Sequence, residues 1–196
     1  LGNFLTYPFV IAAGENAPYD DIDGLAKHAQ TNDVALGHFG APLVPTQVTF
    51  ALAKEKGFNF GSDAAFDALD CNTLASGDVD VINTTLQLIL PCLDSVKVLA
   101  SIGGERIGLT PNTPTVGELA SELDVALWNG LFVKKGVPQD ARDKIIAVAQ
   151  KVMASDAAKK LAADTGALVY WQNADDVKAQ ITKDIATMGA IGEILK

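Results

Sequence analysis

A loop with two glycines carries the first group of residues able to bind a small molecule. It follows an apolar segment and precedes a helical pattern around Val48. Free backbone N–H groups and the positive end of the dipole at a helix N-terminus attract carboxylates and other anions, and glycine lets a ligand approach the backbone closely. The candidate ligand-binding residues here are Gly37, His38, Phe39, Gly40, Ala41 and Thr46. The alternative is an ordinary strand-to-helix turn that uses glycine only for its geometry.

A second candidate group, Asn83 and Thr84, lies at the end of another apolar segment. Ligands of open α/β sheets gather at the carboxyl ends of strands, and an amide and a hydroxyl can each hydrogen-bond a carboxylate. A capped turn before a helix at Leu86 explains the same residues equally well. His38 can donate to an anion, although a lone histidine is more often a surface or internally bonded residue. His28 falls on the polar face of its helix, where we expect it in solvent.

The remainder of the first loop favours a partly apolar ligand. Pro42 and Pro45 remove two N–H donors, and Leu43 and Val44 offer apolar surface in their place. Fewer donors and more apolar area predict a carboxylate with a sizeable hydrophobic part, aliphatic or aromatic. Tighter binding of citrate than of any apolar carboxylate would contradict this hypothesis.

The elements that position these residues alternate between short apolar runs and helical periods, which is typical of an α/β protein. Several runs are apolar on both faces, which favours a parallel sheet covered by helices. Strands are expected at residues 9–13, 34–37, 57–61, 79–83, 96–100, 126–133 and 167–171. Helices are expected around residues 22–29, from Val48 to near Gly57, and over residues 69–74.

The last third of the chain changes to long helices. Pro138 suits the first turn of a helix, and its apolar stripe runs from Ala141 to Val152. Ser155 caps a shorter helix that stops at Gly166. Asn173 then caps a long terminal helix, with acidic residues in its first turn. The strand at 126–133, followed by helices loosely tied to the preceding sheet, suggests that the chain crosses from one lobe to another.

Composition excludes several classes of function. The 196 residues carry 15 basic and 24 acidic side chains, a formal net charge of -9, which disfavours nucleic acid and anionic membrane surfaces as partners. No apolar run approaches the roughly 20 residues of a membrane span, so we expect no direct insertion into a bilayer. The chain starts at Leu1 without a visible signal peptide, which we interpret as a processed or truncated start.

Cysteine and histidine usage argues against an enzyme and against a metal or organic cofactor. Two histidines, no Gly-x-Ser-x-Gly motif and no clustered metal ligands leave no recognisable catalytic group. Gly103-Gly104-Glu105-Arg106 lacks the lysine and hydroxyl residue of a phosphate loop. Cys71 and Cys92 are either one disulfide or two buried thiols.

A series of short motifs resembles the receptors of tripartite tricarboxylate transporters, the Bug-type solute-binding proteins. Each motif is weak alone, but their order and spacing hold across nearly the whole chain. Upstream these are the strand, proline turn and helix of residues 9–27, the Gly37-His38-Phe39-Gly40 loop and the turn at residues 76–80. Downstream they are Pro114-Thr115-Val116-Gly117-Glu118, Trp128-Asn129-Gly130-Leu131, Gly136-Val137-Pro138, the helix ending at Gly166 and the capped terminal helix from Asn173.

The resemblance implies a two-lobe fold like that of type II periplasmic binding proteins. Residues 14–125 would form the second lobe, and residues 1–13 and 126–196 the hinge strands and C-terminal helices of the first. Part of the first lobe would have no counterpart here. The implied function is capture of a small organic carboxylate in the periplasm by lobe closure, with permease subunits as partners. A module that signals to a sensor protein and, less favoured, a small α/β enzyme are the alternatives.

Overall fold

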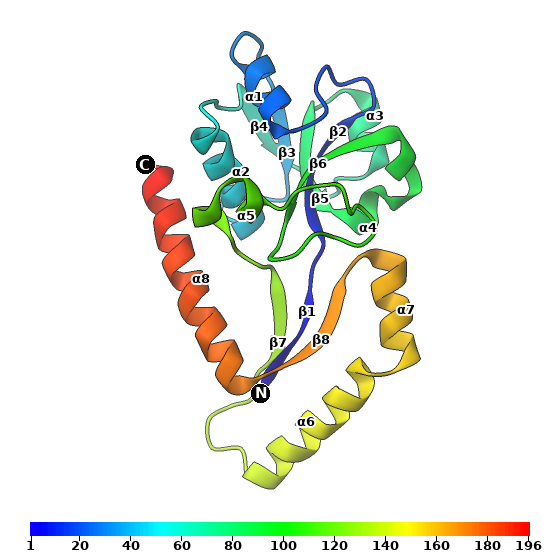
Figure 1. Ribbon diagram of the computed structural model, residues 1–196, viewed down its shortest axis with the longest axis vertical. Coiled ribbons are helices and arrows are strands. Elements are labelled where there is room, and N and C mark those ends of the chain that lie inside the picture. The colour runs from blue at the N-terminus through cyan, green and yellow to red at the C-terminus, as the bar shows by residue number, and fades with distance from the viewer.

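The computed structural model describes all residues, 1–196, and places two β-sheets one above the other with helices around them (Figure 1). The upper sheet has five strands and the lower sheet three. This architecture confirms the α/β class expected from the sequence.

The upper sheet is mixed rather than parallel. Its strands are β2 (Phe9–Gly14), β3 (Ala35–His38), β4 (Ser62–Ala65), β5 (Val81–Thr85) and β6 (Val96–Ile102), in the order β4-β3-β5-β2-β6. β3 pairs in parallel with β4 and β5, whereas β2 is antiparallel to both β5 and β6. The expected parallel sheet is therefore wrong for β2. This strand enters from the lower sheet, and because it is buried on both faces its apolar sequence does not reveal its direction.

β2 also lies on the other side of the expected lobe boundary. The sequence grouped residues 9–13 with the hinge, but these residues pair with β5 and β6 inside the upper sheet. The chain leaves the lower sheet at Thr6, two residues before Pro8. The structural boundary between the two sheets thus falls at Tyr7 and Pro8.

The strand expected at residues 57–61 is displaced to β4. Gly57 has a φ of +75° and ends the preceding helix. Phe58 and Phe60 follow in an irregular segment, where their ring centroids lie 5.4 Å apart. The alternation of these aromatic residues in the sequence is the same as that of a strand, which explains the wrong prediction. The true edge strand is exposed at every position, so it carries no apolar signal.

Helices cover both faces of the upper sheet. They are α1 (Ile22–Ala29), α2 (Val44–Glu55), α3 (Cys71–Ser76), α4 (Leu86–Ile89) and α5 (Val116–Leu119), with 3-10 turns η1 (Leu90–Ser95) and η2 (Ser121–Leu123). Asp21 caps α1 and Asp70 caps α3 through their carboxylates. A core of 22 residues lies on the α1 and α2 side, and a smaller core of 8 residues lies on the other.

Cys71 and Cys92 form a disulfide with their Cα atoms 6.0 Å apart. Of the two alternatives left open by the sequence, the structure has the bonded one. The bond ties α3, which buries none of its residues, to η1. The two cysteines are 21 residues apart, and the chain between them includes β5.

The lower sheet is built from β7 (Trp128–Leu131), β1 (Gly2–Thr6) and β8 (Leu168–Asn173), in that order and antiparallel throughout. β1 was not expected from the sequence, because its five residues show no clear alternation. α6 (Gln139–Met153) and α7 (Asp156–Thr165) follow β7 and run below and beside this sheet (Figure 1). The expected caps are present: Ser155 accepts from Ala158 N–H, and Gly166 ends α7 with φ +73°.

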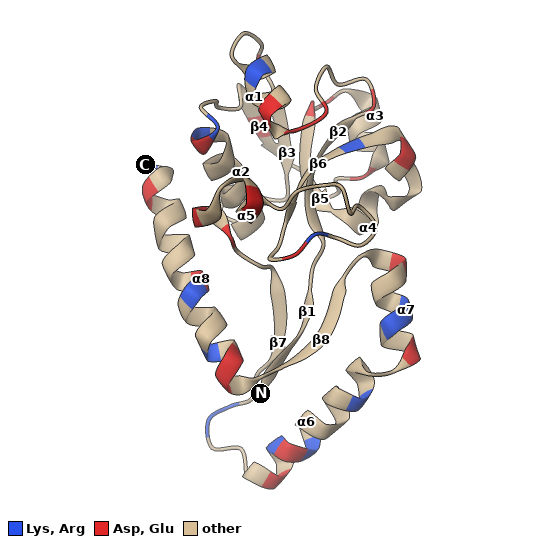
Figure 2. Ribbon diagram, viewed as in Figure 1, with Lys and Arg blue, Asp and Glu red and all other residues tan.

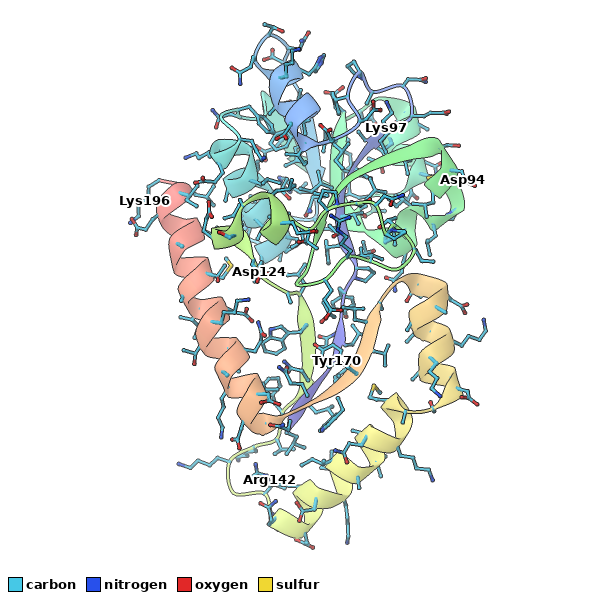
Figure 3. All side chains as sticks on the ribbon, viewed as in Figure 1. Asp94, Lys97, Asp124, Arg142, Tyr170 and Lys196 are labelled. Atoms are coloured by element: carbon cyan, nitrogen blue, oxygen red, sulfur yellow. A yellow bond between two sulfur atoms is a disulfide. The ribbon has the colours of Figure 1, made fainter.

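The terminal helix α8 (Ala174–Ile194) returns from the lower sheet to the upper half, where its last turns run beside α2 (Figure 1). Trp128 donates to Asp184 at 2.7 Å and so joins β7 to α8. Asp124, labelled in Figure 3, accepts from Lys183 of the same helix at 2.6 Å. None of the helices combines the length and the apolar character that crossing a bilayer requires.

Candidate functional site

His38 and Asn83 occupy neighbouring strands at the end of the upper sheet that faces the hinge. β3 and β5 are parallel, and Gly37 lies opposite Ile82. The next residue on each strand is His38 and Asn83, so their side chains leave the same face of the sheet. Both are buried, at 2% and 0% exposed.

Thr46 approaches the same face from α2, the helix that covers it. The His38 ring meets the ring of Phe50 on α2 edge to face, with centroids 6.0 Å apart. Thr46 lies four residues before Phe50 and therefore on the same side of the helix, one turn nearer its N-terminus. It is fully buried as well. Three of the expected site residues thus gather beneath the first turns of α2.

These three side chains hold polar atoms without any protein partner. The atoms are His38 Nδ1, Thr46 Oγ1, Asn83 Oδ1 and Asn83 Nδ2. A buried polar group that makes no hydrogen bond costs about 1–3 kcal/mol, and native proteins leave few of them. Several in one place indicate a site that is completed by another molecule.

The other ring nitrogen of His38 is bonded to Asp63, at 2.8 Å between Nε2 and Oδ2. In the neutral imidazole this bond puts the proton on Nε2 and leaves Nδ1 as an acceptor, whereas the imidazolium presents a second donor at Nδ1. Asp63 was not expected in the site because the sequence predicted the edge strand at residues 57–61, before this residue. An exposed acid in an exposed strand carries no signal that would have found it.

Gly37 and Thr84 are adjacent in sequence to the polar group but lie on the opposite face of the sheet. A side chain at Gly37 would come within 2.9 Å of Leu69, so this glycine permits close packing in the smaller core. The Thr84 hydroxyl donates to the Leu69 carbonyl at 2.7 Å. The structure therefore separates these two residues from His38, Thr46 and Asn83.

The loop from Phe39 to Leu43 lies between β3 and α2 near this group. Gly40 has a φ of +150°, which favours glycine, and its carbonyl accepts from Leu43 N–H at 3.1 Å. Phe39 is half-buried against Phe9, with ring centroids 6.4 Å apart. Ala41 is exposed.

The first turn of α2 offers few donors. It has no side-chain cap, and Pro45 has no N–H. Gln47 already donates to Leu43 O at 3.0 Å. The backbone N–H groups of Val44 and Thr46 remain without a protein acceptor, and they stand at the positive end of the helix dipole. Free backbone donors and buried side-chain donors thus coincide at Thr46.

A bidentate ion pair between Arg106 and Glu118 holds the loop after β6 in place. Arg106 donates from Nε and Nη2 to the carboxylate at 2.9 Å each, and from Nη1 to Pro111 O at 3.2 Å. The hydrogen bonds from Arg106, followed by that from Thr115 N–H, lower the pKa of Glu118 to about 2. Glu118 also completes the capping box of α5 with Thr115.

Because the pKa of Glu118 is depressed, its carboxylate stabilises the folded state above its ordinary pKa of 4.5, and this contribution fades as the pH falls towards 2. We expect Glu118→Gln to lower the melting temperature at pH 6, with the difference from the wild type shrinking as the pH is lowered from 5 to about 3. Thermal unfolding at several pH values checks this. An unchanged difference across that range would contradict it.

Comparison with known proteins gives a family over the full chain. A model of the family described as "Tripartite tricarboxylate transporter family receptor" matches residues 1–196. No curated protein sequence matches.

Solved structures of similar fold include a TctC solute-binding protein from Polaromonas, with TM-score 0.76 and 17% identity, aligned over 97% of this chain and 67% of that one. An R. palustris protein solved with adipate has TM-score 0.79 and 16% identity, with 98% and 66% covered. MatC from Rhodopseudomonas palustris, with bound malate, has TM-score 0.72 and 20% identity, with 99% and 68% covered. The chain thus spans about two thirds of the length of these structures, and their likeness establishes the periplasmic-binding-protein-like fold.

Proposed function

Because the chain belongs to the tripartite tricarboxylate transporter receptor family, we propose that it binds a small organic carboxylate in the periplasm and presents it to permease subunits of a transporter. The observation that carries the proposal is the group of buried polar atoms without partners on His38, Thr46 and Asn83. The group is not arranged for covalent catalysis, since no hydrogen bond joins His38 to the Thr46 hydroxyl. Binding rather than turnover is the function that it supports.

The donors of this group suit a carboxylate. The Thr46 hydroxyl and the Asn83 amide each supply an N–H or O–H, and the free N–H groups of Val44 and Thr46 add backbone donors at the helix N-terminus. His38 adds the ring nitrogen Nδ1, which has no protein partner, while Asp63 holds the ring in place through Nε2. We propose Phe39, Gly40 and Ala41 as supporting positions beside the ligand, whereas Gly37 and Thr84 shape the two strands from the opposite face without contacting it.

Access to the group requires a movement, because its side chains are covered in this structure. In the proposal the loop from Phe39 to Leu43 moves at Gly40, whose φ of +150° few other residues adopt. The ligand then enters from the hinge side of the upper sheet. Closure of two lobes over it, one containing residues 8–125 and the other containing the lower sheet, would expel water and strengthen each hydrogen bond.

The ligand is proposed to have an apolar part. Leu43 is 45% exposed beside the first turn of α2, and Pro42 and Ala41 are exposed with it. Polar side chains that would match the several carboxylates of citrate are absent from this loop. Adipate and malate, which two R. palustris proteins of this fold bind, are the first two acids to compare, since adipate has four methylene groups between its carboxylates.

A thermal-shift screen tests the proposal. A ligand that binds only the folded state raises the melting temperature by mass action. We expect adipate and hexanoate to raise it at millimolar concentration, more than malate or citrate does, and sodium chloride at equal ionic strength to have no such effect. The same screen on Thr46→Val provides the control, because this variant keeps the shape of the side chain but loses its hydroxyl. A shift that persists in Thr46→Val would place the ligand elsewhere, and no shift with any acid would contradict binding by this chain.

A further inference from the structure

A cavity of about 660 Å³ opens at the end of the upper sheet remote from the candidate carboxylate site. We call it the distal pocket. It lies where β2 ends and where β5 and β6 begin, between the turn of residues 14–19 and α3. The bonded Cys71 and Cys92 form part of its wall. Its volume falls within the range of about 300–1,000 Å³ that is usual for small-molecule sites.

Tyr19 is a buried aromatic residue at this pocket. The residue is only 4% exposed, lines the cavity, and has a hydroxyl that forms no hydrogen bond with the protein. Burial, followed by the nearby charge of Asp80, raises the pKa of this phenol to about 12. Tyr19 therefore stays neutral at physiological pH, with an oxygen that can accept a hydrogen bond and a ring that can face a cation. The His28 ring leans against it, with centroids 5.5 Å apart.

The charges that line the pocket are negative. Asp80 uses Oδ2 to accept from Ala35 N–H at 2.8 Å, which fixes the carboxylate and leaves Oδ1 available. Glu15 lines the pocket from the turn after β2. Lys97, labelled near this end of β6 in Figure 3, is already paired with Asp20 at 2.7 Å and Ala17 O at 2.8 Å. No free cation thus balances the two lining carboxylates.

The apolar residues that line the pocket limit the classes of ligand that it could bind. Leu74, Val79 and Val96 give the pocket an apolar floor beside its acids. The chain has no group of three acidic, histidine or cysteine residues that could hold a metal ion. A fixed carboxylate, an aromatic ring and an apolar floor together match an organic cation better than a metal ion or an anion.

We propose that the distal pocket binds a small organic cation of the alkylammonium class, with Asp80 pairing with the ammonium group, Tyr19 contacting it and the apolar floor receiving the alkyl chain. The site is separate from the carboxylate site, because the two lie at opposite ends of the same strands. Acidic residues border the loops at this end of the molecule (Figure 2), and they would draw cations towards the opening.

The test is a titration of the isotope-labelled chain with n-butylammonium chloride, followed by amide chemical shifts. We expect saturable shifts at Tyr19, Asn72 and Ser95, and none at Gly40 or Asn83. Sodium butyrate and sodium chloride at equal ionic strength serve as anion and salt controls. Shifts that do not saturate by about 20 mM, or equal shifts with sodium chloride, would overturn the proposal, because a specific millimolar site saturates in that range.

Three variants distinguish binding in the distal pocket from non-specific attraction of the cation to an acidic protein. Asp80→Asn keeps an acceptor for Ala35 N–H but removes the charge, and we expect it to weaken n-butylammonium binding about fivefold or more. Tyr19→Phe keeps the ring and is expected to weaken it about two- to threefold. Asp78→Asn is the matched control, since Asp78 lies nearby but bonds Ser76 and does not line the pocket. Equal affinity of Asp80→Asn and Asp78→Asn, with both spectra showing folded protein, would refute the assignment.

Discussion

Replacing Asn83 with valine is expected to raise the free energy of unfolding by about 1–3 kcal/mol and to reduce carboxylate binding at least tenfold. Asn83 is fully buried, and neither its amide nitrogen nor its oxygen has a partner. Valine removes both polar atoms and suits a central strand. Stability and binding should therefore change in opposite directions, which is the behaviour of a residue kept for its ligand.

Thr84→Val is the matched control for this prediction. It changes the adjacent residue on the same strand, but the Thr84 hydroxyl already donates to Leu69 O at 2.7 Å. Its loss should lower stability by about 1 kcal/mol and leave carboxylate affinity within about twofold, because the side chain lies on the other face of the sheet. Urea unfolding and the thermal-shift screen give both readouts. Equal destabilisation by the two variants would show that Asn83 is satisfied by internal water rather than reserved for a ligand.

The outcome at these two residues also shows what sequence can predict about the site. Both were expected as ligand-binding residues because they end an apolar run in a doubly covered sheet. Strand periodicity alone could have predicted that Asn83 and Thr84 lie on opposite faces of the sheet, since successive side chains point to opposite faces. It could not have shown which face α2 covers with Thr46, because that depends on how α2 packs. The contact between His38 and Asp63 was equally invisible, as it joins two strands 25 residues apart.

The fold was more predictable than the site, wherever hydrophobic periodicity or capping gave a local signal. The helices capped by Ser155 and Asn173 begin at the residue after each cap, where these side chains predicted. The position of β4 was predicted wrongly because an exposed edge strand has no apolar pattern. The direction of β2 was predicted wrongly because a strand that is buried on both faces has the same apolar pattern in either direction. Both errors come from features that only the neighbouring strands determine.

Ile191→Ala is expected to cost about 2–5 kcal/mol of unfolding free energy, the range for removing a large buried aliphatic side chain. Ile191 is 0% exposed and belongs to the larger core, although it is only five residues from the end of the chain. Ile185, six residues earlier on the same helix, is 68% exposed, and Ile185→Ala should change stability by no more than about 0.5 kcal/mol. Denaturant unfolding of the two variants makes the comparison.

The position of Ile191 extends this prediction from stability to the site. α8 begins at the lower sheet and ends against α2, where Lys54 donates to Ile194 O at 3.1 Å. α2 in turn carries Thr46 and covers His38. Loosening the end of α8 should therefore increase hydrogen exchange of the α2 amides in Ile191→Ala and not in Ile185→Ala. If α2 remained equally protected in both variants, α8 would be a stabilising addition without influence on the carboxylate site; increased exchange would make it the element that couples the lower sheet to that site.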